Sequence, residues 1–300
     1  MRAAGSITRP VPNAALARRA AVAIGLLLAG TAPGFAAAVD FSFGAHGSQG
    51  EFGGAENIRL YEAPLRIVVN RPTSRFILTV PWVRIERTGT VVLTADGPAV
   101  LGIDEGGAGR PSLGLGPART TESGPGDIVL KSETYLSRAG RGRTPWLVLA
   151  LDLKLSTADE DKGLGTGERD WGAGFDYVQP LGSGQVWQFL LDGTYRFTGD
   201  PEGVDLNNRI RLQTGFAAVV RRVGLRVLYE RTTPLLDDVP VYSDAGAVVG
   251  TAAVDDRRAA RFDVTVRSPL GGTTRIGVIK GFGDGSEDLG LLLEFSTGVP

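Results

Sequence analysis

Hydrophobic and polar residues alternate along much of this chain, and the stretch WLVLALDLKL, residues 146–155, shows the pattern most clearly. Leucine occupies every odd position, while the even positions change from Trp146 to Asp152 and Lys154. Successive side chains of a β-strand point to opposite faces of the sheet. The stretch therefore predicts a strand with one face made of leucine alone and a second face that ends in an acid and a base.

The same two-residue period recurs in many other segments. In each of them, apolar side chains share one face and polar or small side chains share the other. The clearest further examples lie at 127–136, 170–177, 187–197, 209–220, 225–230, 261–267 and 289–295. Because this period belongs to strands and not to helices, the pattern predicts an all-β chain.

Two architectures can use such strands. A soluble sandwich buries its apolar faces, whereas a membrane barrel turns them toward lipid. Many of the alternating runs extend over nine to twelve residues. Ordinary strands have about five or six residues, and a tilted membrane strand has about nine to eleven. The lengths favour a barrel, and a soluble periplasmic β-protein is the alternative.

The connections between the predicted strands alternate between short and long. Outer-membrane barrels have short turns at the periplasmic end and longer loops at the outer end. Short turns are expected at 70–74, 139–143, 181–184, 221–224 and 268–272, and longer polar links at 88–126, 157–168, 199–206 and 235–257, with a shorter link at 283–287. Aromatic residues near strand ends, such as Trp146 and Trp187, are compatible with the interfacial girdles of a barrel.

The number of strands also fits a closed barrel. Eleven strands are recognisable between about residues 57 and 296, and Val39–Ala45 adds one before them. The total of twelve is even, as in single-chain bacterial barrels. We therefore expect an all-β fold, an antiparallel transmembrane β-barrel of about twelve strands with closed up-and-down topology. In this barrel the leucines of 146–155 face lipid.

The N-terminus has the pattern of a secretory signal peptide. Four arginines and no acid occupy residues 1–19, the run at 20–29 is apolar, and Ala36-Ala-Ala38 ends the segment. The apolar run is too short to span a bilayer, so cleavage after Ala38 is favoured over a membrane anchor. The predicted organisation is a signal peptide at 1–38 and a barrel domain at 39–300, located in the bacterial outer membrane.

Composition excludes several classes of function. The chain has 32 basic and 33 acidic residues, so it lacks the positive charge of a nucleic-acid-binding protein. It has no cysteine, which excludes disulfides and zinc–thiolate sites. The expected partners are outer-membrane lipid and a small-molecule solute, and the chain is expected to act as a monomer without a cofactor.

Many charged residues fall on the polar faces of the predicted strands. An ionised side chain that faces lipid near the middle of the bilayer costs about 2–4 kcal/mol, so these residues are expected to face the lumen. There they can pair with one another or line a pore that selects solutes by charge. The predicted pore-lining residues are Lys131, Glu133, Asp152, Lys154, Asp176, Asp192, Arg196, Arg209, Arg211, Arg226, Glu230, Arg261, Asp263, Arg267, Arg275 and Glu294. Arginines outnumber acids from Arg196 onward, which suggests a mild preference for anions.

Three features could carry other chemistry. His46 is the only histidine, so a hydrolase of the barrel would have to use it, but no nucleophile signature lies nearby. Gly163–Gly167 is rich in glycine but lacks the ending of a phosphate-binding loop, which favours a tight turn. The acids at 159–161 could bind calcium weakly, although a calcium site needs six or more oxygen ligands, which favours a solvated loop.

The segment 154–167, KLSTADEDKGLGTG, and the strand start SGPGD at 123–127 resemble a family of outer-membrane transporters linked by name to the meta pathway of phenol degradation. Its members carry a Lys-x-Pro-Thr-Gly-Asp-type segment leading into Leu-Gly-Thr-Gly. The matching positions are Lys154, Thr157, Asp159, Gly163, Gly165, Thr166 and Gly167. Ser156, Ala158 and Pro125 depart from the pattern, and five residues follow the aromatic Phe295 of the last strand. The resemblance implies a barrel without established catalytic residues.

These observations predict a pore or transporter for small molecules, with aromatic or hydrophobic compounds implied by the resemblance. The alternatives are a hydrolase carried by a barrel and a structural surface barrel without a transport role. The link at 88–126 has four prolines and is long for a hairpin loop. It is expected to form either a long outer loop or a plug folded into the lumen.

Overall fold

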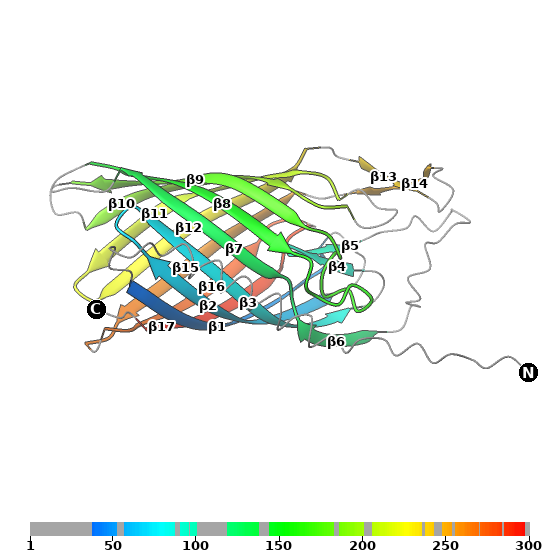
Figure 1. Cartoon of the computed structure of the whole chain (residues 1–300), viewed down its shortest axis with the longest axis horizontal. Helices are drawn as coiled ribbons and strands as arrows, with labels where there is room; N and C mark the ends of the chain where they lie inside the picture. Colours follow the sequence, from blue (N-terminus) through cyan, green and yellow to red (C-terminus); the bar gives the residue numbers. More distant parts are fainter. Residues whose placement is uncertain are drawn as a thin grey trace, which may run out of the picture. The chain divides into compact units, whose positions relative to one another are not determined.

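The structure is a computed structural model in which one antiparallel sheet closes into a barrel (Figure 1). It describes residues 38–52, 57–87, 91–95, 97–100, 119–137, 144–182, 186–200, 206–235, 238–242, 248–253, 256–269, 271–283 and 285–297. The predicted signal peptide lies outside the described residues except for Ala38, where β1 begins. None of the described residues forms a helix that is long and apolar enough to cross a membrane.

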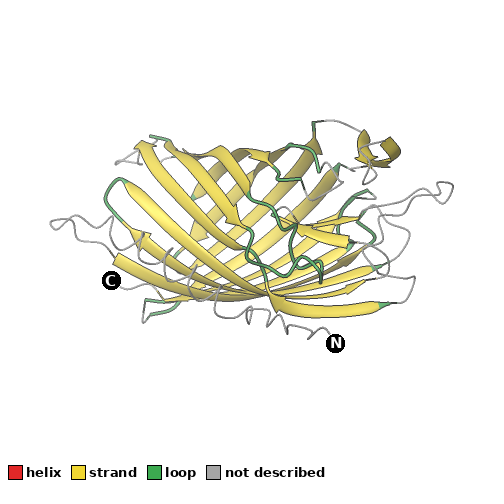
Figure 2. Cartoon of the chain, turned by 45° about the vertical axis from the view of Figure 1, so that its right-hand side comes forward, coloured by secondary structure: helices red, strands yellow, loops and turns green. Residues whose placement is uncertain are grey.

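Twelve long strands form the barrel wall, and each pairs antiparallel with its neighbours (Figure 2). In chain order they are β1 (Ala38–Gly50), β2 (Ile58–Asn70), β3 (Ser74–Arg87), β7 (Ile128–Ser137), β8 (Trp146–Leu155), β9 (Asp170–Leu181), β10 (Trp187–Phe197), β11 (Arg209–Val220), β12 (Val223–Pro234), β15 (Arg257–Arg267), β16 (Thr273–Gly281) and β17 (Leu289–Thr297). The first strand pairs with the last, from Phe41 opposite Thr297 to Gln49 opposite Leu289. This pairing closes the barrel, so the predicted closed twelve-stranded fold is confirmed.

The short strand β6 (Thr120–Pro125) shares one place in the wall with β7. Both strands pair with β3: β7 with the half that begins at Ser74, and β6 with the half that ends at Arg87. Gly126 and Asp127 lie between them. The wall of the barrel therefore has one interrupted strand, and the part of the long link nearest β7 belongs to the wall.

The two ends of the barrel differ in the length of their connections. The connections β2–β3, β9–β10, β11–β12 and β15–β16 are short, and they lie at the end where β1 begins and β17 ends (Figure 1). The other end carries the longer connections, which include two small hairpins. These are β4 (Val91–Thr94) with β5 (Gly97–Val100), and β13 (Asp238–Tyr242) with β14 (Val248–Ala253). We call these two ends the short-turn end and the long-loop end.

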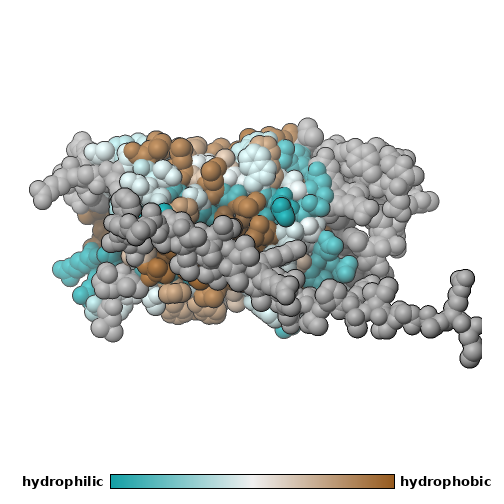
Figure 3. All heavy atoms as spheres, in the orientation of Figure 1, coloured by the Kyte–Doolittle hydropathy of each residue, from teal (hydrophilic) through white to brown (hydrophobic). Residues whose placement is uncertain are grey.

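The outward face of the wall is apolar over its middle. Leu151 and Leu291 are 61% and 57% exposed, and neighbouring strands contribute Val227, Phe262 and Ile276 to the same face. Figure 3 shows hydrophobic side chains gathered over the middle of the visible face, with hydrophilic ones mostly toward its ends. An exposed apolar surface of this size is stable only when another apolar phase covers it. The surroundings that suit the leucines of β8 are lipid.

Replacing Leu151 by arginine tests this assignment. Leu151 lies at the middle of β8 on the outward face. In lipid, arginine there is expected to destabilise the barrel by about 2–4 kcal/mol. The measurement is the urea midpoint of the barrel refolded into vesicles. Leu151→Ala is the control, because it removes apolar area without adding charge. Equal midpoints for the two variants would contradict a lipid-facing position.

Candidate functional site

The interior face of the barrel carries the charged residues, and it forms the candidate site. Each of the sixteen residues predicted to line a pore lies on a barrel strand, on the side opposite the exposed apolar residues of that strand. Most belong to ion pairs. Most of the pairs form three groups: one near the long-loop end on β7 to β10, one at mid-height on β10 to β12, and one toward the short-turn end on β12 to β17 with Arg66 of β2. Glu133 forms a separate set of pairs with Arg75 and Lys131.

Lys154 is the centre of the first group. Its Nζ lies 3.2 Å from Asp127 Oδ2 and 3.2 Å from Asp170 Oδ2. It also donates a hydrogen bond of 2.8 Å to Thr166 Oγ1. All of these side chains are buried. A buried ammonium is tolerated because two carboxylates and a hydroxyl replace its water.

Asp127 connects Lys154 to the loop that follows β8. Its Oδ1 accepts hydrogen bonds of 2.8 Å from the backbone N–H groups of Thr157 and Ala158. Thr157 Oγ1 in turn accepts one of 2.9 Å from the N–H of Ile128. The loop at 156–169 is thereby fixed to the β6–β7 junction. The two segments that carry the family resemblance, 123–127 and 154–167, contact each other directly through these bonds.

The glycines of this loop make room for charged groups. Gly163 has a φ of +66°, which side chains disfavour. A Cβ added to Gly163 would collide with the Arg87 guanidinium, and one added to Gly165 would lie 2.6 Å from Asp127 Oδ2. Gly167 also has a positive φ, of +75°. The glycine-rich segment is thus a tight loop packed around ions, in a strand-to-strand context.

Removing the Lys154 ammonium should unfold this corner of the barrel. Lys154→Met leaves Asp127 and Asp170 buried without a cation, and breaking a buried pair in this way costs about 3–5 kcal/mol. The measurement is the urea midpoint, together with the rate of proteolysis within 156–169. Lys131→Met is the control, because Glu133 keeps its pair with Arg75 at the barrel wall. Similar losses in both variants would contradict a special role for Lys154.

Further pairs join strands of the interior. Arg196 of β10 lies 3.1 Å from Asp152 of β8, across β9, and Arg211 lies 3.5 Å from Asp192 of the neighbouring strand. Gln213 donates a hydrogen bond of 2.9 Å to Glu230. Asp176 stands directly opposite Asp192 in the β9–β10 register. The three strands β8 to β10 together carry four acids on the interior face, namely Asp152, Asp170, Asp176 and Asp192.

Arginines dominate the third group. Asp263 is buried and lies 2.8 Å from Arg261 and 3.3 Å from Arg275, and it also accepts a hydrogen bond of 2.9 Å from Arg226 Nε. Glu294 lies 3.4 Å from Arg275 and 2.7 Å from Arg66. Four guanidinium groups thus share two carboxylates. The group has a formal charge of +2 inside the barrel.

A cavity of about 290 Å³ opens from this group toward the short-turn end. Thr265 and Thr273 contribute hydroxyl groups to it. Its basic lining residues are Arg221, Arg222, Arg226, Arg267 and Arg275, and no acid lines it in the described part of the chain. The cavity can therefore accept an anion, because guanidinium groups bind carboxylate and phosphate oxygens in a planar, forked geometry.

The hairpin β4–β5 lies inside the long-loop end. Val91 and Leu93 are buried in one apolar cluster with inward residues of the barrel wall. The other members of the cluster are Phe52, Ile58, Leu60, Val83, Ile85 and Leu164. Arg87 holds the hairpin in place, with one guanidinium nitrogen on the Val91 carbonyl and the other 3.0 Å from the Lys162 carbonyl.

A second interior cavity, of about 280 Å³, lies beside this hairpin. Thr94, Ala95 and Pro98 of the hairpin line it on one side. Wall residues from β1, β11, β12 and β15, among them Arg211 and Arg261, line it on the other. The hairpin therefore separates a polar interior from the long-loop end. Of the link at 88–126, residues 88–90, 96 and 101–118 lie outside the described residues.

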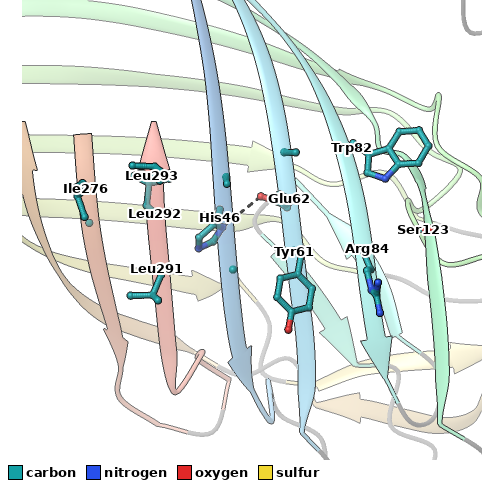
Figure 4. A pocket seen from close by; sticks show the side chains of 14 residues that line it. His46, Tyr61, Glu62, Trp82, Arg84, Ser123, Ile276, Leu291, Leu292 and Leu293 are labelled. Atoms are coloured by element: carbon teal, nitrogen blue, oxygen red, sulfur yellow. Dashed lines mark ion pairs between the residues drawn. The ribbon is translucent and has the colours of Figure 1, made fainter. Parts of the chain in front are cut away.

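His46 lies on the interior face of β1, with Nδ1 3.5 Å from Glu62 Oε2 (Figure 4). Its Nε2 is buried, and no described residue gives it a hydrogen bond. No serine hydroxyl among the described residues is hydrogen-bonded to the ring. Asp159, the first acid of the 159–161 group, pairs with Lys162 at 3.1 Å, and the described residues contain no group of three or more potential metal ligands.

Several interior charges were not anticipated by the sequence. Asp127 directly precedes β7, and Asp170 begins β9. Their shared contact with Lys154 depends on the sheet register, which the sequence alone does not give. Arg66 and Arg75 lie on β2 and β3, where apolar residues occupy both faces and hide the alternation. The expected turn at 139–143 lies outside the described residues.

Comparisons with known proteins bear on the fold. No model of a known protein family matches this sequence, and no curated protein is similar to it in sequence. An outer-membrane channel from Pseudomonas putida F1 is similar over 90% of this chain and 97% of its own, with 14% identity and a TM-score of 0.59. The beta domain of the Bordetella autotransporter BrkA covers 88% of this chain and 100% of its own, with 12% identity and a TM-score of 0.46. The Pseudomonas putida toluene transporter TodX covers 91% of each chain, with 10% identity and a TM-score of 0.41.

At 10–14% identity these similarities concern the fold alone. The similarities to BrkA and TodX have TM-scores below 0.5, and nothing more is inferred from them. The chain has the antiparallel barrel fold of outer-membrane proteins. The resemblance to the transporters linked to phenol degradation stays a prediction.

Proposed function

We propose that this chain is an outer-membrane channel that admits small molecules through a lumen constricted at its long-loop end. The observation that carries the proposal is the structure of the barrel interior. A charged lumen contains two cavities, and an internal hairpin covers the outer one. A barrel that served only as a surface structure would not need a net positive charge or open volume inside.

The hairpin β4–β5 is the proposed constriction. It is held by apolar contacts and by Arg87, and it has no strand partner in the barrel wall among the described residues. Apolar packing of a short hairpin can be released without breaking the closed sheet. Release of the hairpin would expose the apolar cluster that contains Val91, Leu93 and Leu164, which would suit an apolar or aromatic solute, the class that the family resemblance implies. Charged lumen residues further inside would then orient its polar end.

Deleting the hairpin tests the constriction. A variant with 91–100 replaced by a short Gly-Ser linker is expected to swell liposomes faster in small sugars and phenolic acids, because the covered end is opened. The control replaces the other outer hairpin, 238–253, which belongs to a separate two-stranded sheet. If neither variant nor the unaltered barrel admits any solute, the proposed channel function is wrong. If both deletions raise the rate equally, the hairpin is not the constriction.

The arginine group is proposed to favour anions. Guanidinium charge near a pore attracts anions and repels cations. In the barrel without 91–100, Arg261→Gln with Arg275→Gln is expected to lower the anion-to-cation permeability ratio several-fold. Reversal potentials in a potassium chloride gradient measure this ratio. Arg231→Gln with Arg258→Gln removes the same charge from exposed positions beside Asp256 and should leave the ratio unchanged. An unchanged ratio in the lumen variant would refute the preference.

A further inference from the structure

A groove of about 790 Å³ follows the outward face of the barrel across β16, β17, β1, β2, β3 and β6 (Figure 4). Its floor is formed by the small residues Ala45, Gly47 and Ala63. Its walls are large apolar side chains that are between 36% and 57% exposed, namely Tyr61, Trp82, Ile276, Leu291 and Leu293. His46 and Glu62 also belong to its lining, but their side chains point to the interior, whereas the large apolar walls lie on the outward face. The apolar part of the groove is therefore separate from the lumen proposed to carry solute.

Three arginines meet at one end of this groove. Arg84 lines the groove beside Tyr61, its partner across the β2–β3 register. It lies 2.9 Å from Glu86, which is also 3.2 Å from Arg119 and 3.8 Å from Arg59. The arginine side chains are 55%, 58% and 47% exposed. One carboxylate therefore serves three guanidinium groups, and the rim of the groove has a formal charge of +2.

The position of this rim along the wall is informative. From Trp82 to Arg84, β3 runs toward the long-loop end and advances by about 7 Å along the strand, at 3.3–3.4 Å per residue. The outward face changes over this distance from exposed tryptophan to exposed arginine. With the apolar band in hydrocarbon, the arginines lie at the level of the lipid headgroups.

We infer that this groove binds a phosphate-bearing lipid, with an acyl chain against Trp82 and the phosphate on Arg59, Arg84 and Arg119. The inference rests on the membrane location that the proposed function includes. A soluble anion would have no use for the apolar groove. A second copy of the chain, related by twofold symmetry, would bring two positive rims together. Only a ligand that is apolar along its length and anionic at one end satisfies both parts of the site.

Fluorescence quenching can test this binding at Trp82. The chain has four tryptophans, and replacing Trp146, Trp171 and Trp187 by phenylalanine leaves Trp82 as the only reporter. The barrel is placed in phosphatidylcholine vesicles that contain a minor fraction of brominated lipid. Brominated phosphatidic acid is expected to compete for the groove about 30-fold better than brominated phosphatidylcholine, since each basic charge near the surface contributes about 1 kcal/mol toward anionic lipid and the rim has a net charge of two. Equal quenching by the two lipids would overturn the inference.

Variants then separate the two parts of the site. Arg59→Gln, Arg84→Gln and Arg119→Gln together should remove the preference, whereas Arg231→Gln with Arg258→Gln should keep it. Ala63→Phe fills the floor of the groove and should weaken binding of the brominated phosphatidic acid with the rim intact. A preference that survives loss of the three arginines, or an Ala63→Phe barrel that binds as before, would refute the joint site.

The result is distinguishable from failure of the proposed function. A barrel that inserts but admits no solute would overturn the channel and leave the lipid measurement valid. A chain that does not insert would show no quenching of Trp82 by either lipid. That result would contradict the membrane location on which both proposals depend.

Discussion

The pairing of β1 with β17 is the interaction on which the rest of this structure depends. Backbone N–H and C=O groups cannot be left unpaired in hydrocarbon, so a sheet in lipid must close on itself. Here the closure extends from Phe41–Thr297 to Gln49–Leu289. A slip of one residue in this register would turn every side chain of a strand to the other face. Closure in this register therefore decides which residues meet lipid and which meet one another inside.

The arrangement of charges inside the barrel follows from this register. Charges that are excluded from lipid are crowded into a barrel of twelve strands, and they must find partners there. Near β8 and β9 acids are in excess, because Lys154 alone contacts both Asp127 and Asp170. Toward the short-turn end arginines are in excess, because Asp263 and Glu294 pair with four of them. The first group fixes a loop, and the second leaves a net positive charge inside the barrel.

The fold could be predicted from the sequence because period two is a local property of each strand. It yielded the all-β class, the twelve strands and the side on which Leu151 or Asp152 lies. Contacts across the register are not local, so the bonds from Asp127 to Thr157 and Ala158 could not be derived from spacing. The pattern was also weak where both faces of a strand are apolar, as at Val83 on β3. The reason is visible only in the structure, where the hairpin β4–β5 covers that residue.

The same stretch of wall shows where lipid ends. Through most of the barrel, apolar residues face outward and charges face inward. At the long-loop end of β2 and β3 the order is reversed, with Ile58 and Ile85 buried inside and Arg59 and Glu86 outside. Such a reversal is stable only if water or headgroups surround the wall there and an apolar body fills its interior. The hairpin supplies that body, and in the proposed membrane location the arginine rim lies where the wall leaves the hydrocarbon. The proposed constriction and the proposed lipid site therefore lie at one height of the barrel, on its two opposite faces.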